Sequence, residues 1–103
     1  MRKEDLDMYA PDDILAPAAR EIHRGKLPAD VETQLRRDLA RADRQNGRVY
    51  GGLLPAYDLL STGQWPETAA ARDELCRKWQ TSSRQLYQWR RDVLFCYAVA
   101  SKL

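Results

Sequence analysis

The stretch CRKWQTSSRQLYQWRR, residues 76–91, decides how the second half of this chain folds. A short polar break, QTSS, separates two segments whose apolar residues recur at helical spacing. Ser82 and Gln85 have the spacing of a capping box. In this motif the serine hydroxyl accepts a hydrogen bond from the amide of the third helical residue, and the glutamine side chain bonds back to the backbone of the serine. The stretch therefore predicts one helix that ends near Trp79, a short turn, and a second helix that begins after Ser82.

The rest of the chain also has a helical pattern, without the sustained alternation of period two that indicates a strand. Gly and Pro residues divide it into segments, and each segment reads as a helix or a turn. The predicted helices cover about residues 12–24, 29–45, 53–61, 66–79 and 83–101. We therefore expect a single all-α domain over residues 1–103, with 1–10 as a loosely held lead-in. The last of these helices would be long for a domain of this size.

Composition narrows the classes of function. The chain has 17 basic and 15 acidic residues, so any nucleic-acid role has to depend on local clustering of charge. Two cysteines and one histidine, with no C-x-x-C motif, predict neither a disulfide framework nor a metal site. The absence of a nucleotide loop and of a nucleophile–base pair predicts a protein that is not an enzyme and needs no cofactor or small-molecule substrate. The lack of a signal segment and of a membrane-length apolar run predicts a cytoplasmic protein.

The helix that follows the polar break has one face turned away from the expected core. Its inner stripe is apolar and comprises Leu86, Trp89, Val93 and either Cys96 or Tyr97. The outer face carries Arg84, Gln88 and Arg91 at spacings of four and three residues. Arginine can fork to guanine and glutamine to adenine, while hydroxyls, lysines and free helix amides hold phosphates. The candidate DNA-binding residues are therefore Lys78, Ser82, Ser83, Arg84, Gln85, Gln88 and Arg91.

This region resembles the helix-turn-helix of transposase-like proteins and of small phage or plasmid regulators. Their pattern is a small residue, three positions, a Gly, an aliphatic residue, a Ser, and a helix that ends L-Y-x-W. The matching residues are Cys76, Thr81, Ser82, Leu86, Tyr87 and Trp89. The resemblance implies that residues 53–103 form a tri-helical helix-turn-helix core that ends in a long C-terminal helix, with the helix predicted over 53–61 as its third helix. Gln80 stands where the family usually has Gly, at a turn position that often needs a positive φ. The resemblance implies a sequence-specific DNA-binding protein, a small transcriptional regulator or accessory factor of a phage or mobile element, that reads the major groove of double-stranded DNA with the helix beginning near Ser83.

The C-terminal half of the last predicted helix, residues 93–100, is apolar on every face. Such a helix is buried within the fold or against a partner, and helix-turn-helix proteins commonly act as dimers on two half-sites. This predicts a homodimer interface through Phe95, Tyr97 and Val99. The same apolar segment suits an alternative function, a non-enzymatic interaction module that acts as an inhibitor or adaptor and binds another protein.

Two further groups of residues have both a structural and a nucleic-acid interpretation. Arginines are frequent in and after the helix predicted over residues 29–45, at Arg36, Arg37, Arg41, Arg44 and Arg48. Because Glu32, Asp38 and Asp43 are interleaved with them, we expect a solvated, salt-bridged face, with a path for a phosphate backbone as the alternative. Trp79 and Trp89 fall on the inner stripes, so we expect them in the core and not stacked on bases.

Overall fold

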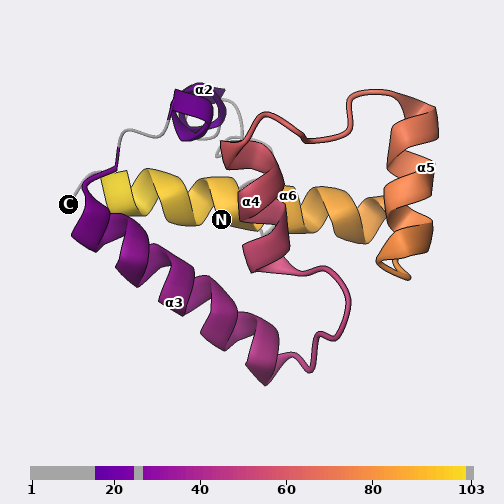
Figure 1. The fold of residues 1–103 in the computed structure, drawn as a ribbon, viewed down its shortest axis with the longest axis horizontal. Coiled ribbons are helices and arrows are strands. Elements are labelled where there is room, and N and C mark those ends of the chain that lie inside the picture. The colour runs from indigo at the N-terminus through magenta and orange to yellow at the C-terminus, as the bar shows by residue number, and fades with distance from the viewer. Residues whose placement is uncertain (1–15, 25–26, 102–103) are drawn as a thin grey trace, which may run out of the picture.

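The protein is all-α in the computed structural model, which describes residues 16–24 and 27–101. These two ranges contain the helices α2 (Ala16–Arg24), α3 (Ala29–Gln45), α4 (Leu53–Ser61), α5 (Ala69–Lys78) and α6 (Ser83–Ser101) (Figure 1). The bounds of α3, α4 and α6 agree with those expected from the sequence. The lead-in predicted for residues 1–10, and the start of the helix predicted over 12–24, lie outside the described residues. None of the described helices is both long and apolar enough to cross a membrane.

The other helices pack around α6. In Figure 1 this helix crosses the middle of the molecule, with α2 above it, α3 below it, α4 across it and α5 at its N-terminal end. Its buried residues are Leu86, Trp89, Val93, Leu94, Tyr97 and Ala98. They form one apolar cluster with Ile22 of α2, Leu39 of α3 and Tyr57 of α4. The core therefore lies where three helices meet the inner stripe of α6.

The structure does not confirm a tri-helical core within residues 53–103. α5 contains no buried residue and, among the described helices, packs against α6 alone. The core instead recruits α2 and α3, through residues such as Ile22 and Leu35. The physical reason is the composition of α5, AAARDELCRK, whose only large aliphatic side chain is Leu75. A helix with so narrow an apolar face can cover a neighbour but cannot form a core layer.

α5 also begins later than the sequence indicates. Pro66 suits the first position of a helix, which is why the predicted start lies there. The structure has Thr68 as the N-cap instead, because its Oγ1 accepts a hydrogen bond from the amide of Ala71 at 3.1 Å. Trp79, predicted as the last helical residue, is the C-cap.

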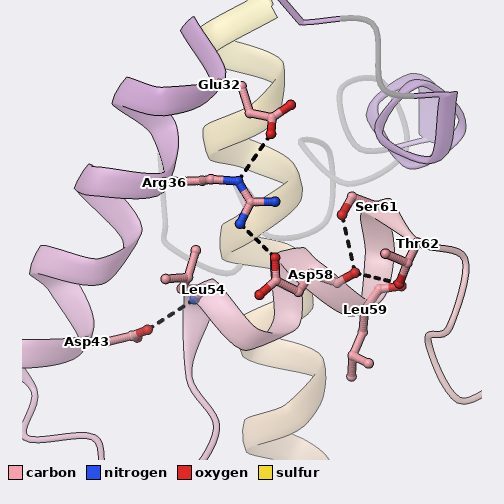
Figure 2. A network of polar contacts seen from close by, with 8 residues as sticks. All are labelled: Glu32, Arg36, Asp43, Leu54, Asp58, Leu59, Ser61 and Thr62. Atoms are coloured by element: carbon pink, nitrogen blue, oxygen red, sulfur yellow. Dashed lines mark hydrogen bonds and ion pairs between the residues drawn. The ribbon is translucent and has the colours of Figure 1, made fainter. Parts of the chain in front are cut away.

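A polar network joins α3 to α4 (Figure 2). Arg36 donates from Nη1 to Asp58 Oδ1 at 2.8 Å and from Nε to Glu32 Oε1 at 3.1 Å. Its guanidinium also lies 4.8 Å from the centroid of the Tyr57 ring. The hydrogen bond to Asp58 raises the pKa of Arg36, while burial raises the pKa of Tyr57. Because the ion pairs are substantially exposed, each contributes less than about 1 kcal/mol, and their main effect is to set how the two helices align.

Asp43 of α3 caps the first turn of α4 across the connecting loop. Its Oδ1 accepts from the amide of Leu53 at 2.8 Å and its Oδ2 from the amide of Leu54 at 3.0 Å, the second of which Figure 2 draws. The N-cap residue, Gly52, has no side chain to do this and has a φ of 119°. A Cβ at Gly52 would lie 2.6 Å from Asp43 Oδ1. Glycine therefore leaves the space through which a carboxylate from another helix reaches the free amides.

Replacing Asp43 with Ala removes both acceptors from the start of α4. We expect the free energy of unfolding to fall by about 1–2 kcal/mol, because two helix amides lose a charged capping partner. Urea denaturation followed by circular dichroism measures this change. Asp73→Ala, at an exposed position on α5, is the matched control and should stay within about 0.5 kcal/mol of the parent. An Asp43→Ala variant as stable as the parent would show that water satisfies these amides equally well.

Candidate nucleic-acid interface

The chain turns abruptly between α5 and α6. Figure 1 shows α5 lying across the N-terminal end of α6 and not continuing its axis. The amide of Thr81 donates to the carbonyl of Cys76 at 2.9 Å, and the amide of Gln80 donates to that of Arg77 at 3.3 Å. This pair of bonds is a Schellman motif, which satisfies the last carbonyls of α5 and ends it. The predicted break after Trp79 is therefore confirmed, with residues 79–82 as the turn.

Gln80 occupies the left-handed position of this motif. Its φ is 51°, and no other non-glycine residue in the described part of the chain has a positive φ. The expectation that this position requires a positive φ is confirmed. A side chain here costs on the order of 1 kcal/mol relative to glycine, because Cβ crowds the backbone carbonyl. The rest of the fold must therefore hold the turn in place.

Trp79 connects the turn to the rest of the protein. Its ring lies 6.1 Å from that of Trp89, centroid to centroid, with the planes inclined at 60°. On the other side the loop before α4 closes on the indole, since a Cβ at Gly51 would lie 2.7 Å from Trp79 Cδ2. Arg48 of the same loop places its guanidinium 5.0 Å from the centroid of the Trp89 ring. Both tryptophans thus have packing roles, as the sequence indicates, and they position a cationic loop beside the turn.

Ser82 starts α6 as its N-cap. Its Oγ accepts from the amide of Gln85 at 3.2 Å, which confirms the serine half of the predicted capping box. The side chain of Gln85 makes no reciprocal bond to the backbone of Ser82 within the described residues. The amides of Ser83 and Arg84 have no acceptor there either. Two free donors at the positive end of a helix dipole can bind an anionic group such as a phosphate.

The predicted DNA-binding residues all lie on or next to the surface around this turn. The exposed members are Lys78, Ser82, Ser83, Arg84 and Gln88, and the half-buried members are Gln85 and Arg91. Gln88 donates from Nε2 to Asp92 Oδ1 at 3.0 Å, so one of its amide hydrogens already has an acceptor. Arg84 and Lys78 form no ion pair with any residue that the structure describes. The start of α6 therefore presents hydroxyls, free amides and uncompensated cations together.

Tyr87 belongs to this surface, although the sequence analysis did not select it as a binding residue. Its ring is about half exposed, and the guanidinium of Arg72 from α5 lies 5.9 Å from the ring centroid. Arg72 in turn donates from Nη1 to the carbonyl of Glu67 at 3.1 Å. The signal that could have identified Tyr87 is its position one residue after the buried Leu86, off the inner stripe of α6.

The arginines on the outside of α3 differ from the salt-bridged face that the sequence predicts. The acidic residues expected to pair with them have other partners. Glu32 pairs with Arg36, Asp43 caps the first turn of α4, and Asp38 accepts a hydrogen bond from Gln34. The remaining exposed arginines, which form no ion pair with any described residue, are Arg37, Arg41 and Arg44. The prediction of paired charges is therefore wrong for these three. Of these three, Arg44 lies in the last turn of α3, which leads into the loop that contacts Trp79.

The residues predicted to form a homodimer interface do not share one surface. Tyr97 is 1% exposed and lies in the core, so it cannot contact a second copy, and this part of the prediction is wrong. Phe95 and Val99 are 47% and 48% exposed. The reason is helical geometry: residues four apart share a face, whereas residue 97 lies two positions from each and points to the other side.

Comparison of the chain with protein-family models, curated proteins and solved structures gave no match. The properties of this interface are therefore those of its own residues. They are a helix with a free N-terminus, two exposed long polar side chains one turn apart, and cations without acidic partners among the described residues.

Replacing Gln80 with Gly tests the conformation of the turn. We expect the free energy of unfolding to rise by about 0.5–1 kcal/mol, because glycine adopts the left-handed region without steric cost. Chemical denaturation of the folded protein measures the change. Gln45→Gly, at the end of α3, is the control and should not stabilise, since that residue is helical. A loss of stability in Gln80→Gly would mean that contacts of the Gln80 side chain outweigh its backbone strain.

Proposed function

We propose that the protein binds double-stranded DNA, with the first turns of α6 in the major groove and the α5–α6 turn against the phosphate backbone. The observation that supports this most is the uncovered N-terminus of α6, with Arg84 and Gln88 exposed beside free backbone amides. It is the arrangement that a helix-turn-helix uses to bring one helix to base edges. The protein would act as a sequence-specific regulator or accessory factor, as the resemblance of residues 76–89 implies.

Base recognition would depend on Arg84 and Gln88. They are four residues apart on the outer face of α6, a separation of about 6 Å along the helix axis. This is enough to reach neighbouring base pairs of one site. Arg84 suits guanine, through paired bonds to O6 and N7, and Gln88 suits adenine through N6 and N7. Arg91, one turn further along α6, would contact the flank of the same site.

Phosphate contacts would surround these two side chains. The hydroxyls of Ser82 and Ser83 and the first amides of α6 form one group of donors. Lys78, at the end of α5, forms a second, and the arginines at the end of α3 and in the following loop form a third. Because the net charge of the chain is only +2, DNA affinity would come from this local cluster and would weaken steeply with salt.

DNA binding by α6 does not require the homodimer predicted from the sequence. With Tyr97 in the core, only Phe95 and Val99 of the predicted interface can meet a second copy. A dimer on two half-sites would place two α6 helices about 34 Å apart along the duplex. Light scattering of the free protein and of its DNA complex measures whether one or two copies bind.

Substitution of Arg84 by Ala tests the assignment of α6. We expect DNA affinity to fall by about 1–3 kcal/mol, with relaxed specificity at one position, because a bidentate contact to a base is lost. Fluorescence anisotropy measures this with a duplex that the parent protein selected from a random pool. Gln88→Ala should likewise lower affinity and relax specificity at a neighbouring base pair. Ser83→Ala should weaken binding to all DNA sequences by the same amount, because it removes a phosphate contact.

Arg20→Ala is the matched control, because this exposed arginine lies on α2, on another part of the fold. It should leave DNA affinity within about 0.3 kcal/mol of the parent. Unchanged specific binding by an Arg84→Ala/Gln88→Ala double variant would show that another surface reads the DNA. A parent protein that binds no duplex at low salt would refute the proposed function itself.

A further inference from the structure

A groove lies between the N-terminal half of α3 and the C-terminal half of α6, with a volume of about 560 Å³. Its apolar lining residues are Val31, Leu35, Phe95, Cys96, Val99 and Ala100. Its polar lining residues are Asp30, Gln34 and Asp38, all from α3. One wall is thus mainly apolar, and the other carries carboxylates above an apolar floor.

The groove contains two of the large apolar side chains that remain exposed in the described fold. Phe95 and Val99 lie one helical turn apart on the outer face of α6, and each is about half exposed. Val31 of α3 and Cys96 of α6, both half-buried, continue the same apolar lining. Small proteins seldom leave a continuous apolar surface uncovered unless it has a partner. The spacing of these residues along two helices suits the apolar face of a third helix laid between them.

The charged side chains that line the groove are all acidic. Asp30 and Asp38 are exposed, and neither forms an ion pair with any residue that the structure describes. Burial raises the pKa of the Cys96 thiol, and the carboxylates of Asp92 and Asp38 raise it further. The carboxylate of Asp38 therefore interacts with a thiol that also lines the groove. An occupant that places cations beside its apolar residues would compensate these carboxylates.

We infer that this groove binds an amphipathic helix of another protein, with its apolar residues against Phe95 and Val99 and with lysines or arginines beside Asp30 and Asp38. A second copy of this chain fits less well. A two-fold interface through Phe95 and Val99 would bring two acidic edges of the same sign into one contact. A basic partner helix meets both the apolar and the electrostatic requirement.

The groove and the candidate DNA surface lie on one face of α6. Along that face the exposed residues change from Arg84 and Gln88 to Phe95 and Val99. The two pairs are offset by about 16 Å at 1.5 Å per residue, so a partner helix would be held next to bound DNA without covering Arg84 and Gln88. The carboxylates of Asp30 and Asp38 would also disfavour phosphates within the groove itself.

A peptide-binding experiment with the full chain tests the groove directly. The probe is a fluorescent helical peptide of about 18 residues, with leucines on one face and lysines along both sides of them. We expect it to bind with a Kd in the micromolar range. A second peptide with glutamate in place of every lysine should bind at least about ten times more weakly, because its charges meet Asp30 and Asp38.

Variants of the groove supply the matched comparison. Phe95→Ser should weaken the lysine peptide at least about ten-fold, and Asp38→Asn should weaken it several-fold and reduce its dependence on salt. Val49→Ser is the control, because Val49 is an exposed apolar residue of the loop before α4, outside the groove. Bound peptide should also slow alkylation of Cys96 relative to that of Cys76, which lies on α5. Circular dichroism establishes that each variant is folded.

Two results would overturn the inference. One is equal binding of the lysine and glutamate peptides, or no binding of either. The other is a dimeric mass for the parent protein that Phe95→Ser converts to a monomeric mass, which would identify a second copy as the occupant. DNA binding is scored separately: Phe95→Ser should retain the DNA affinity of the parent, and Arg84→Ala should retain its peptide affinity. Loss of one activity therefore does not decide the other.

Discussion

Burial of one stripe of α6 holds this protein together. Leu86, Val93, Leu94 and Tyr97 are almost fully removed from solvent, and each such side chain contributes roughly 1.5–3 kcal/mol. The stripe is covered by α2, α3 and α4, all of which pack against α6. Near the start of α6, Leu86 and Trp89 are buried, whereas the small and charged residues of α5 leave Ser83, Arg84 and Gln88 exposed. The outer face at the start of α6 is thus exposed because the large apolar residues of the other helices pack against its inner stripe.

The exposed start of α6 is positioned by backbone chemistry at both ends of the turn. The Schellman motif ends α5, and the Ser82 hydroxyl begins α6, so few conformations remain for the residues between them. The loop before α4 supports this geometry because Gly51 allows its backbone to lie against Trp79. The strain at Gln80 is therefore tolerated within a turn that its surroundings over-determine. Rigid presentation of this kind favours recognition, since little side-chain and backbone freedom is lost on binding.

The outer face of α6 combines two chemistries that act in different ways. At its N-terminal end, cations and hydrogen-bond donors suit a polyanion, whose binding there would weaken as the salt concentration rises. At its C-terminal end, Phe95 and Val99 lie beside the carboxylates of α3 and suit an apolar, basic partner. α3 lies beside both, because Asp30 and Asp38 line the groove, whereas Arg41 and Arg44 follow toward the C-terminal end of the helix. Under the two proposals, one small domain would offer separate surfaces to DNA and to protein.

The sequence by itself determined the all-α class, the bounds of α3, α4 and α6, the break after Trp79 and the Ser82 cap. These features depend on helical periodicity and on capping groups within a few residues, so they can be predicted without knowledge of the tertiary structure. The candidate DNA-binding face was equally accessible, because exposure along α6 follows from the period of its apolar stripe.

Only the tertiary structure decided which helices build the core, what Asp43 does and which arginines of α3 lack acidic partners. It also decided that Tyr97 is buried while Phe95 and Val99 form one wall of a groove. The sequence of α6 is apolar all round at residues 93–100, so periodicity alone cannot distinguish the side that α2 and α3 cover from the side left open. That choice depends on long-range packing, in which a carboxylate or an apolar face finds its partner many residues away along the chain.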